Sequence, residues 1–264
     1  MKVVALVQAR MGSARLPGKV LMDIGGMSML GRVVRRVQRA RLVQQTIVAA
    51  TREAADEPIV RECERLGVEV VRGSEQDVLD RFYQAASFCG ATVVVRITSD
   101  CPLIDPGVID RVVRAFQRHG PDYASNVLRR TYPRGLDTEV ISCSALERAW
   151  REATEPTQRV HVTPYLYQHP ERFRLLSVTR WTVAAAPPSH ASQTVTRSRR
   201  PGAAAGQHRW TVDTREDLDF VQEVYRRLGN DDSFRWTDVL DLLAQDPALA
   251  ELNRSVRQKG LHEG

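Results

Sequence analysis

Apolar and polar positions follow two different periods in the first half of the chain. Short runs rich in valine, isoleucine and alanine predict buried strands, because such strands are apolar on both faces. Between these runs, apolar residues recur every three to four positions, which predicts amphipathic helices. The predicted strands are 3–7, 46–50, 68–71 and 92–97, and the predicted helices are 28–42, 56–66 and 77–88, with another beginning near Pro106. This alternation is typical of a doubly wound α/β sheet.

The second half of the chain is less regular. Two strands are expected at 123–127 and 137–141, around a loop at 131–136 with turn residues at its centre. A further strand is expected at 209–212 and a helix at 215–228.

One segment has a composition unlike its surroundings. Residues 184–208 contain a single large aliphatic side chain and no aromatic one. Such a segment buries too little surface to offset the entropy lost on ordering, so we interpret it as a flexible insertion. The tetrapeptide Arg-Trp-Thr-Val stands on both sides of it, at 180–183 and 209–212. We expect one domain over residues 1–230 that contains the insertion, and peripheral helices with a frayed end over residues 231–264.

Length, composition and charge limit the kinds of protein that this chain can be. A chain of 264 residues with 42% hydrophobic residues is long enough for one large α/β domain. The formal net charge is +6, but the positive residues are scattered, so we do not expect nucleic acid as a partner. No apolar run approaches the roughly 20 residues that a membrane helix needs, and no signal-peptide pattern is present, so we expect a cytoplasmic protein. The cysteines Cys63, Cys89, Cys101 and Cys143 lack the spacing of a zinc site or a disulfide framework.

The strongest chemical signal lies in the loop after the first predicted strand. Residues 8–21 read Gln-Ala-Arg-Met-Gly-Ser-Ala-Arg-Leu-Pro-Gly-Lys-Val-Leu. Ligands of open α/β sheets bind at the carboxyl ends of strands, and here Arg10, Arg15 and Lys19 stand among small residues whose backbone amides can reach an anion. The segment has neither the Walker spacing nor the dinucleotide-binding pattern. We interpret it as a loop that binds a triphosphate.

The same loop resembles the opening signature of the cytidylyltransferases that make CMP-activated acidic sugars. That family includes the acylneuraminate and 3-deoxy-manno-octulosonate cytidylyltransferases, and the Met-Gly-Ser-x-Arg-Leu-Pro-Gly-Lys form looks most like the spore coat polysaccharide branch. The resemblance runs from residue 1 to about 180 and resumes from about 209 to 228. It implies an α/β fold with a doubly wound mixed sheet of the nucleotide-diphospho-sugar transferase type, and a small subregion for the sugar and the dimer contact. It also implies that the nucleotide is bound by Ala9, Arg10, Gly12, Ser13, Arg15 and Lys19.

Two aspartates are expected to bind a divalent metal. Asp100 and Asp213 each follow a predicted strand, and magnesium prefers one or two carboxylates together with phosphate oxygens and water. Asp100 lies in a segment that resembles the family's Asp-x-Pro-Leu-Ile motif, and Asp213 opens one that resembles its closing metal motif, so the resemblance implies that both bind Mg²⁺. Asp105 is instead expected to cap the helix that follows it. Glu216 and Asp217 are expected to stabilise the N-terminus of the helix at 215–228.

Two segments resemble the part of the family's fold that binds the sugar. Tyr-Pro-Arg-Gly-Leu-Asp-Thr-Glu-Val implies contacts from Arg134 and Glu139, and Arg-Val-His-Val-Thr-Pro implies contacts from Arg159 and His161. Arg134 suits a substrate carboxylate, although an exposed surface arginine fits the residues equally well. A structural role is the alternative for His161. Val160 stands where the family motif has glutamate, which leaves the identity of the sugar open.

The resemblance implies a homodimer that transfers CMP from CTP to an acidic sugar and releases pyrophosphate, for synthesis of a surface polysaccharide or glycoconjugate. In-line attack of a hydroxyl on the α-phosphorus depends on positioning and charge neutralisation, which we assign to Arg15, Lys19, Asp100 and Asp213. Two other functions stay open. One is a glycosyltransferase that uses a nucleotide-sugar donor, because a fold alone does not decide the reaction. The other is a non-catalytic relative that binds nucleotide or nucleic acid.

Overall fold

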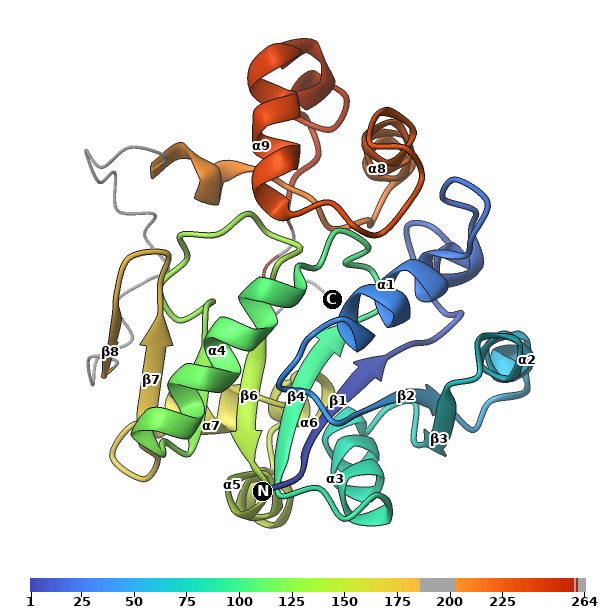
Figure 1. Cartoon of the computed structure of the whole chain (residues 1–264). Helices are drawn as coiled ribbons and strands as arrows, with labels where there is room; N and C mark the ends of the chain where they lie inside the picture. The colour runs from blue at the N-terminus through green and yellow to red at the C-terminus, as the bar shows by residue number, and fades with distance from the viewer. Residues whose placement is uncertain (186–202, 259, 261–264) are drawn as a thin grey trace.

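Figure 1 shows the computed structural model of the chain, which describes residues 1–185, 203–258 and 260. Within this part, eight strands form one sheet in the order β3-β2-β1-β4-β6-β5-β7-β8. Strands β1, β2, β3 and β4 are parallel, whereas β6 is antiparallel to both β4 and β5. The expected mixed α/β sheet is therefore confirmed. The strands are β1 (Val3–Gln8), β2 (Gln45–Thr51), β3 (Glu69–Gly73), β4 (Val93–Thr98), β5 (Tyr123–Ser125), β6 (Glu139–Ser142), β7 (Leu175–Val178) and β8 (Val183–Ala185).

Helices pack on both faces of the sheet, because side chains of its central strands alternate between two buried clusters. Val3, Ala5 and Val7 of β1 lie in one cluster with residues of α1 and α4, while Val4 and Leu6 lie in a second cluster with residues of α3 and α5. The helices of these two layers are α1 (Met29–Gln38), α2 (Glu57–Leu66), α3 (Val78–Phe88), α4 (Pro106–His119), α5 (Cys143–Glu152), α6 (Pro156–His161) and α7 (Pro164–Gln168).

A third cluster joins the C-terminal part of the chain to the carboxyl edge of the sheet. It contains buried side chains of α8 (Arg215–Arg227), α9 (Trp236–Gln245) and the short 3₁₀ helix η4 (Pro247–Glu251), packed around Trp210 and Val212. Figure 1 shows α8 and α9 together at the end of the molecule toward which β1 and β4 point. Residues beyond 230 therefore share a hydrophobic core with the segment that precedes Asp213.

The strand expected at 209–212 is wrong. Within the described residues this stretch makes a single isolated bridge, between Arg209 and Arg134. The backbone N–H of Trp210 donates to the carbonyl of Arg134, whereas that of Val212 donates to the carbonyl of Asp100. These two acceptors lie on different loops, so the stretch cannot form a continuous ladder with one neighbouring strand.

Side-chain hydrogen bonds shorten the strands at 123–127 and 137–141. The amide of Asn126 donates to the carbonyl of Leu136 and accepts from the backbone N–H of Thr138, at 2.7 and 2.9 Å. Beyond the end of β5 at Ser125 and before the start of β6 at Glu139, these side-chain bonds therefore stand beside a single long backbone bond of 3.4 Å from Asn126 to Thr138. Asp105 caps α4 as expected, because its carboxylate accepts from the backbone N–H of Val108 at 3.0 Å.

Most of the expected insertion, residues 186–202, lies outside the described part. Its two ends are described: Ala184 and Ala185 belong to β8, and the 3₁₀ helix η3 (Ala203–Gln207) contains the buried Ala205. None of the helices in the described ranges combines the length and the apolar character that crossing a membrane requires.

Candidate functional site

The loop after β1 folds back on itself at the carboxyl edge of the sheet. The carbonyl of Met11 accepts the backbone N–H groups of Ser13 and Gly18, at 2.9 and 3.1 Å, and Met11 donates its own N–H to Asp56 at 2.7 Å. Gly18 has a φ of 71°, a left-handed conformation that glycine adopts without strain, and it leads into the 3₁₀ helix η1 (Lys19–Leu21). The loop therefore directs Lys19 back toward the ends of the central strands.

Lys19 lies between the two aspartates that the sequence assigns to metal. Its Nζ is 2.9 Å from Oδ1 of Asp213, 3.3 Å from Oδ2 of Asp100 and 2.7 Å from the carbonyl oxygen of Val212. Burial alone would lower the pKa of Lys19, but the charges of Asp100 and Asp213 raise it above its ordinary value. Three residues predicted from separate motifs thus meet at one ammonium group.

Asp213 is surrounded by positive charge. Its Oδ2 is 3.0 Å from the guanidinium of Arg15 and 2.7 Å from that of Arg209. Burial by itself would raise the pKa of Asp213, but Lys19, Arg209 and Arg15 together lower it to about 2. Asp213 is therefore ionised at neutral pH.

Asp100 is held by the end of β4. Thr98, the last residue of that strand, donates its hydroxyl to Oδ1 of Asp100 at 2.6 Å. The carbonyl of Asp100 accepts from the backbone N–H of Val212 at 2.8 Å. This backbone contact brings the segment before Asp213 to the carboxyl end of β4, so the two carboxylates face one site although 209–212 is not a strand.

The remaining residues of the predicted nucleotide loop contact neighbouring elements of the sheet edge. Ala9 is buried and donates its backbone N–H to Ala49 of β2, while Arg10 is exposed and lies 3.9 Å from Glu75. A Cβ added to Gly12 would lie 3.3 Å from the Glu75 carboxylate, so this position has little room for a side chain. The loop from Ala9 to Lys19 therefore runs from the end of β1 past the segment after β3.

Sequence reasoning missed two arginines near this loop, the buried Arg81 and the partly buried Arg96. Within the described residues, Nε and Nη2 of Arg81 and Nε of Arg96 are buried without a hydrogen-bond partner. Burial and the nearby charge of Arg10 lower the pKa of Arg81 to about 10. A buried cation with unused donors is costly unless a ligand completes it. An arginine on the apolar face of the helix predicted at 77–88 was the available signal for Arg81.

The predicted sugar contacts have different surroundings. Arg134 is half-buried, and its guanidinium has no hydrogen-bond partner in the described ranges. Glu139 is buried, pairs with Arg96 and accepts from the hydroxyl of Tyr123 at 2.5 Å. Arg159 forms a double contact with Asp77, the N-cap of α3, at 3.0 and 2.5 Å. His161 is the half-buried last residue of α6.

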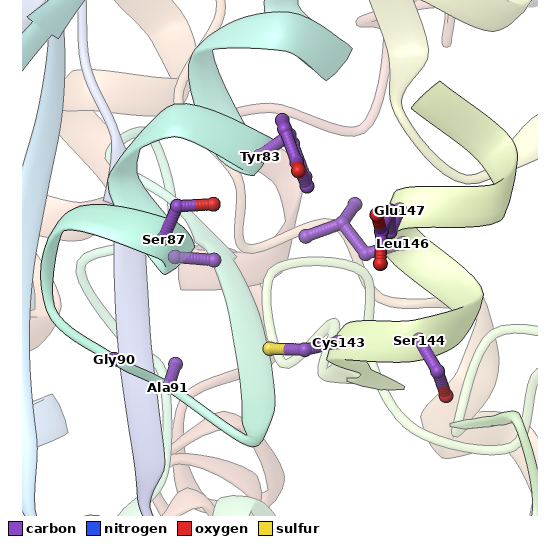
Figure 2. Close-up of a pocket in the computed structure, with 9 residues that line it drawn as sticks. Tyr83, Ser87, Gly90, Ala91, Cys143, Ser144, Leu146 and Glu147 are labelled. Carbon is purple, nitrogen blue, oxygen red and sulfur yellow. The ribbon is translucent and has the colours of Figure 1, made fainter. Parts of the chain in front are cut away.

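A hollow of about 270 Å³ lies away from these residues, between α3 and α5. Figure 2 shows that Tyr83 and Ser87 of α3 face Cys143 and Glu147 of α5 across it, near Gly90. This hollow lies where the chain enters β4, whereas Asp100 follows the exit of that strand. It is therefore at the opposite edge of the sheet from Lys19.

The described ranges contain no group of three or more aspartate, glutamate, histidine or cysteine side chains that could hold a metal. Asp100 and Asp213, with the carbonyl of Val212, still present three oxygen atoms to one cationic group, Lys19 Nζ. Mg²⁺ prefers oxygen ligands and takes the remainder from water and phosphate. The donor set therefore fits a magnesium ion bound together with a phosphorylated substrate.

Comparison with known proteins identifies a family and close relatives. A family model described as Cytidylyltransferase matches residues 4–228. The chain is 37% identical to the uncharacterized protein MJ1063 of Methanocaldococcus jannaschii, over 100% of this chain and 99% of that protein. It is 30% identical to the spore coat polysaccharide biosynthesis protein SpsF of Bacillus subtilis, over 94% of this chain and 96% of that protein. The solved structure of a cytidylyltransferase from Leptospira borgpetersenii matches with a TM-score of 0.83 at 28% identity, covering 98% of this chain and 100% of that one.

Proposed function

The chain belongs to the cytidylyltransferase family and is a nucleotidyltransferase; from this premise we propose that it transfers CMP from CTP to a hydroxyl group of an acidic sugar and releases pyrophosphate. One observation carries the proposal. The ammonium group of Lys19, which follows a glycine-containing loop, lies 3.3 Å from the carboxylate of Asp100 and 2.9 Å from that of Asp213. This arrangement supplies both cations for a triphosphate and carboxylates for a metal.

The triphosphate is assigned to the cations of the loop. Arg15 and Lys19 both pair with Asp213 in the described structure, so their donors already point into one region. A triphosphate that enters this region offers them more negative charge than one carboxylate does, and we propose that Lys19 turns from the aspartates toward it.

The metal is assigned to the two carboxylates that Lys19 now bridges. Asp100 and Asp213 would hold Mg²⁺ once Lys19 has turned, and the bound ion would neutralise charge on the phosphates and lower the pKa of the acceptor hydroxyl. The chain's own part is to orient these groups. Thr98 orients Asp100 and Arg209 orients Asp213 through hydrogen bonds, so both carboxylates are already ordered before substrates bind.

The acidic group of the acceptor is assigned to Arg134. Its guanidinium is half-buried and without a hydrogen-bond partner in the described ranges, and planar donors of this kind bind carboxylates through two parallel bonds. Glu139 and Arg159 already pair with Arg96 and Asp77, so a direct contact from either to the sugar would compete with an existing ion pair. The resemblance to spore coat and related enzymes supports a product used in a surface polysaccharide or glycoconjugate.

The test is pyrophosphate release. Purified protein with Mg²⁺ is given each of the four nucleoside triphosphates and a panel of 3-deoxy and nonulosonic acids, and pyrophosphate and the CMP-sugar are measured. We expect release with CTP and at least one acid. Release of a nucleoside diphosphate from a nucleotide-sugar donor would instead support glycosyl transfer, and CTP binding without turnover on any acceptor would support the non-catalytic alternative.

We also propose that the protein is a cytoplasmic homodimer, which the resemblance of the segments around Arg134 and Arg159 supports. Light scattering coupled to size exclusion measures the assembly in solution. A monomer over the concentration range used for the assay would contradict this part of the proposal.

A further inference from the structure

The orientation of the Asp213 carboxylate depends on the side chains of other residues. It lies before α8, in a stretch without regular structure. Two groups hold its Oδ2, Arg15 at 3.0 Å and Arg209 at 2.7 Å. Arg15 belongs to the loop assigned to the triphosphate, so Arg209 is the contact that remains when Arg15 turns toward the nucleotide.

Arg209 is in turn held by Asp217, which is completely buried. The two side chains form a forked ion pair with two contacts of 2.9 Å. Asp217 also accepts the backbone N–H groups of Asp213 and Thr214, at 2.9 and 3.2 Å. Asp217 therefore fixes both the backbone of Asp213 and the cation that orients its carboxylate, in addition to the helix-capping role expected from the sequence.

Asn253 completes this arrangement from the C-terminal segment. Its side-chain Nδ2 donates to Oδ1 of Asp217 at 3.0 Å and to the carbonyl of Arg209 at 2.9 Å. The residue is only 5% exposed. One amide group thus ties the backbone of Arg209 to the carboxylate that holds its side chain, and Gln258 accepts from the same guanidinium at its other end.

We infer that Asn253 is a positioning residue, which holds Arg209 and Asp217 so that the carboxylate of Asp213 faces Lys19 and the metal site. This inference rests on the proposed function, because it assigns Asn253 to the orientation of a group used in that reaction. The family model that matches this chain ends at residue 228, so Asn253 lies beyond the part that the model covers. The C-terminal segment is therefore part of the active-site architecture and not only a peripheral addition.

The test compares Asn253→Ala and Asn253→Asp with the control Leu249→Ala. The aspartate variant keeps the shape of the side chain but lacks the Nδ2 donor. Leu249 is buried in the third cluster on η4 and makes no polar contact with the site, so its variant reports the effect of destabilising the same segment. Pyrophosphate release, the Mg²⁺ concentration for half-maximal rate and thermal melting are measured on the full chain.

Both Asn253 variants are expected to lower kcat about tenfold and to raise the Mg²⁺ concentration that gives the half-maximal rate. The KM for CTP is expected to stay within about twofold of the wild-type value. The reason is that loss of the Asn253 donor leaves a buried polar group unpaired, which displaces the Arg209–Asp217 ion pair that orients Asp213. Leu249→Ala is expected to lower the melting temperature while kcat and the Mg²⁺ dependence stay at the wild-type values. Wild-type kcat and Mg²⁺ dependence in the Asn253 variants would overturn the inference and leave a structural role.

A crystal structure of Asn253→Ala separates this inference from the proposed function. We expect the Asp213 carboxylate to have moved away from Lys19, which is observable whatever the protein catalyses. An unchanged Asp213 would overturn the inference even if CTP is the substrate. If wild-type protein releases no pyrophosphate but Asp213 moves in the variant, the proposed function fails and the positioning role stands.

Discussion

At the scale of single residues, one ammonium group links three motifs that are distant in sequence. Lys19 Nζ contacts Asp100, Asp213 and the carbonyl of Val212, and each contact crosses between separate parts of the chain. The two aspartates differ in what else they touch: Asp213 also pairs with Arg15 and Arg209, whereas Asp100 also accepts from the Thr98 hydroxyl. This difference predicts different consequences for their substitution.

Asp100→Asn and Asp213→Asn are each expected to lower kcat for Mg²⁺-dependent pyrophosphate release by at least about a hundredfold, because each removes metal-binding charge at nearly constant volume. The measurement is pyrophosphate release, with circular dichroism to show that each variant is folded. A folded variant that keeps a near-normal rate would remove its aspartate from the metal site.

Asp213→Asn is also expected to lower the stability of the folded protein in a pH-dependent way. The pKa of Asp213 is lowered to about 2 in the folded state, so its stabilising effect is present above the unfolded-state value of about 4 and is lost as the pH falls toward 2. In metal-free buffer at pH 7, Asp213→Asn should therefore reduce the free energy of unfolding by about 2 kcal/mol, and the deficit should shrink as the pH falls from about 4 toward 2. Urea unfolding of the wild type and of Asp213→Asn at several pH values measures it. A deficit independent of pH would assign the loss to packing.

Lys19→Arg is expected to weaken CTP binding about tenfold although the charge is kept. A compact ammonium fits between two carboxylates and a carbonyl, whereas a planar guanidinium with five donors requires a wider site. Titration calorimetry with CTP compares wild type, Lys19→Arg and Lys19→Met. Equal affinities for all three would exclude Lys19 from the nucleotide site.

At the scale of elements, the site depends on loops that pack against each other rather than on a strand. Gly135 lies beside the backbone of Trp210, which pairs with Arg134. This contact and the hydrogen bond from Val212 to Asp100 together position the segment before Asp213. They do so without the backbone pairing that a strand at 209–212 would have provided.

Gly135→Ala tests this close approach. Gly135 has a φ of 107°, and an added Cβ would lie 2.6 Å from the carbonyl carbon of Trp210, so the two loops would have to separate. We expect a loss of about 2 kcal/mol in the free energy of unfolding together with reduced turnover, because Asp213 would move with Trp210. Gly67→Ala is the matched control: its φ is also positive, at 64°, but its Cβ would meet nothing within 4 Å. Equal effects of the two variants would show that φ alone, and not the loop contact, sets the cost.

At the scale of the whole molecule, the two ends of the expected insertion differ from its middle, residues 186–202. Its two ends have regular contacts: Ala184 and Ala185 are exposed but pair with β7 as part of β8, and Ala205 of η3 is buried. The composition of residues 186–202 remains too poor in large apolar side chains to build a core of its own.

We therefore expect that replacement of residues 188–200 by a short glycine-serine linker leaves the melting temperature within a few degrees of the wild-type value. Pyrophosphate release should stay near the wild-type rate. The reason is that the entropic cost of closing a loop changes by only about 0.6 kcal/mol per doubling of its length. Deletion of all of 184–208 should cost more, because it removes strand residues that pair with β7 at one end and the buried Ala205 at the other. Thermal melting and pyrophosphate release measure both variants. Preserved melting with lost turnover in the linker variant would assign the replaced segment to substrate binding.

The amino-acid sequence by itself determined the alternation of strands and helices, the mixed sheet, and the residue types of the nucleotide loop and of Asp100 and Asp213. These are local properties: hydrophobic period and short motifs depend on neighbouring residues. Only the tertiary structure decided that Lys19 joins the two aspartates, that 209–212 is held by two loops and is no strand, and that Arg81 is buried with unused donors. Such pairings depend on strand order and on how loops pack, so no local pattern contains them. Asn253 shows this most clearly, because an isolated asparagine near the end of a chain carries no signal until folding sets it beside Arg209 and Asp217.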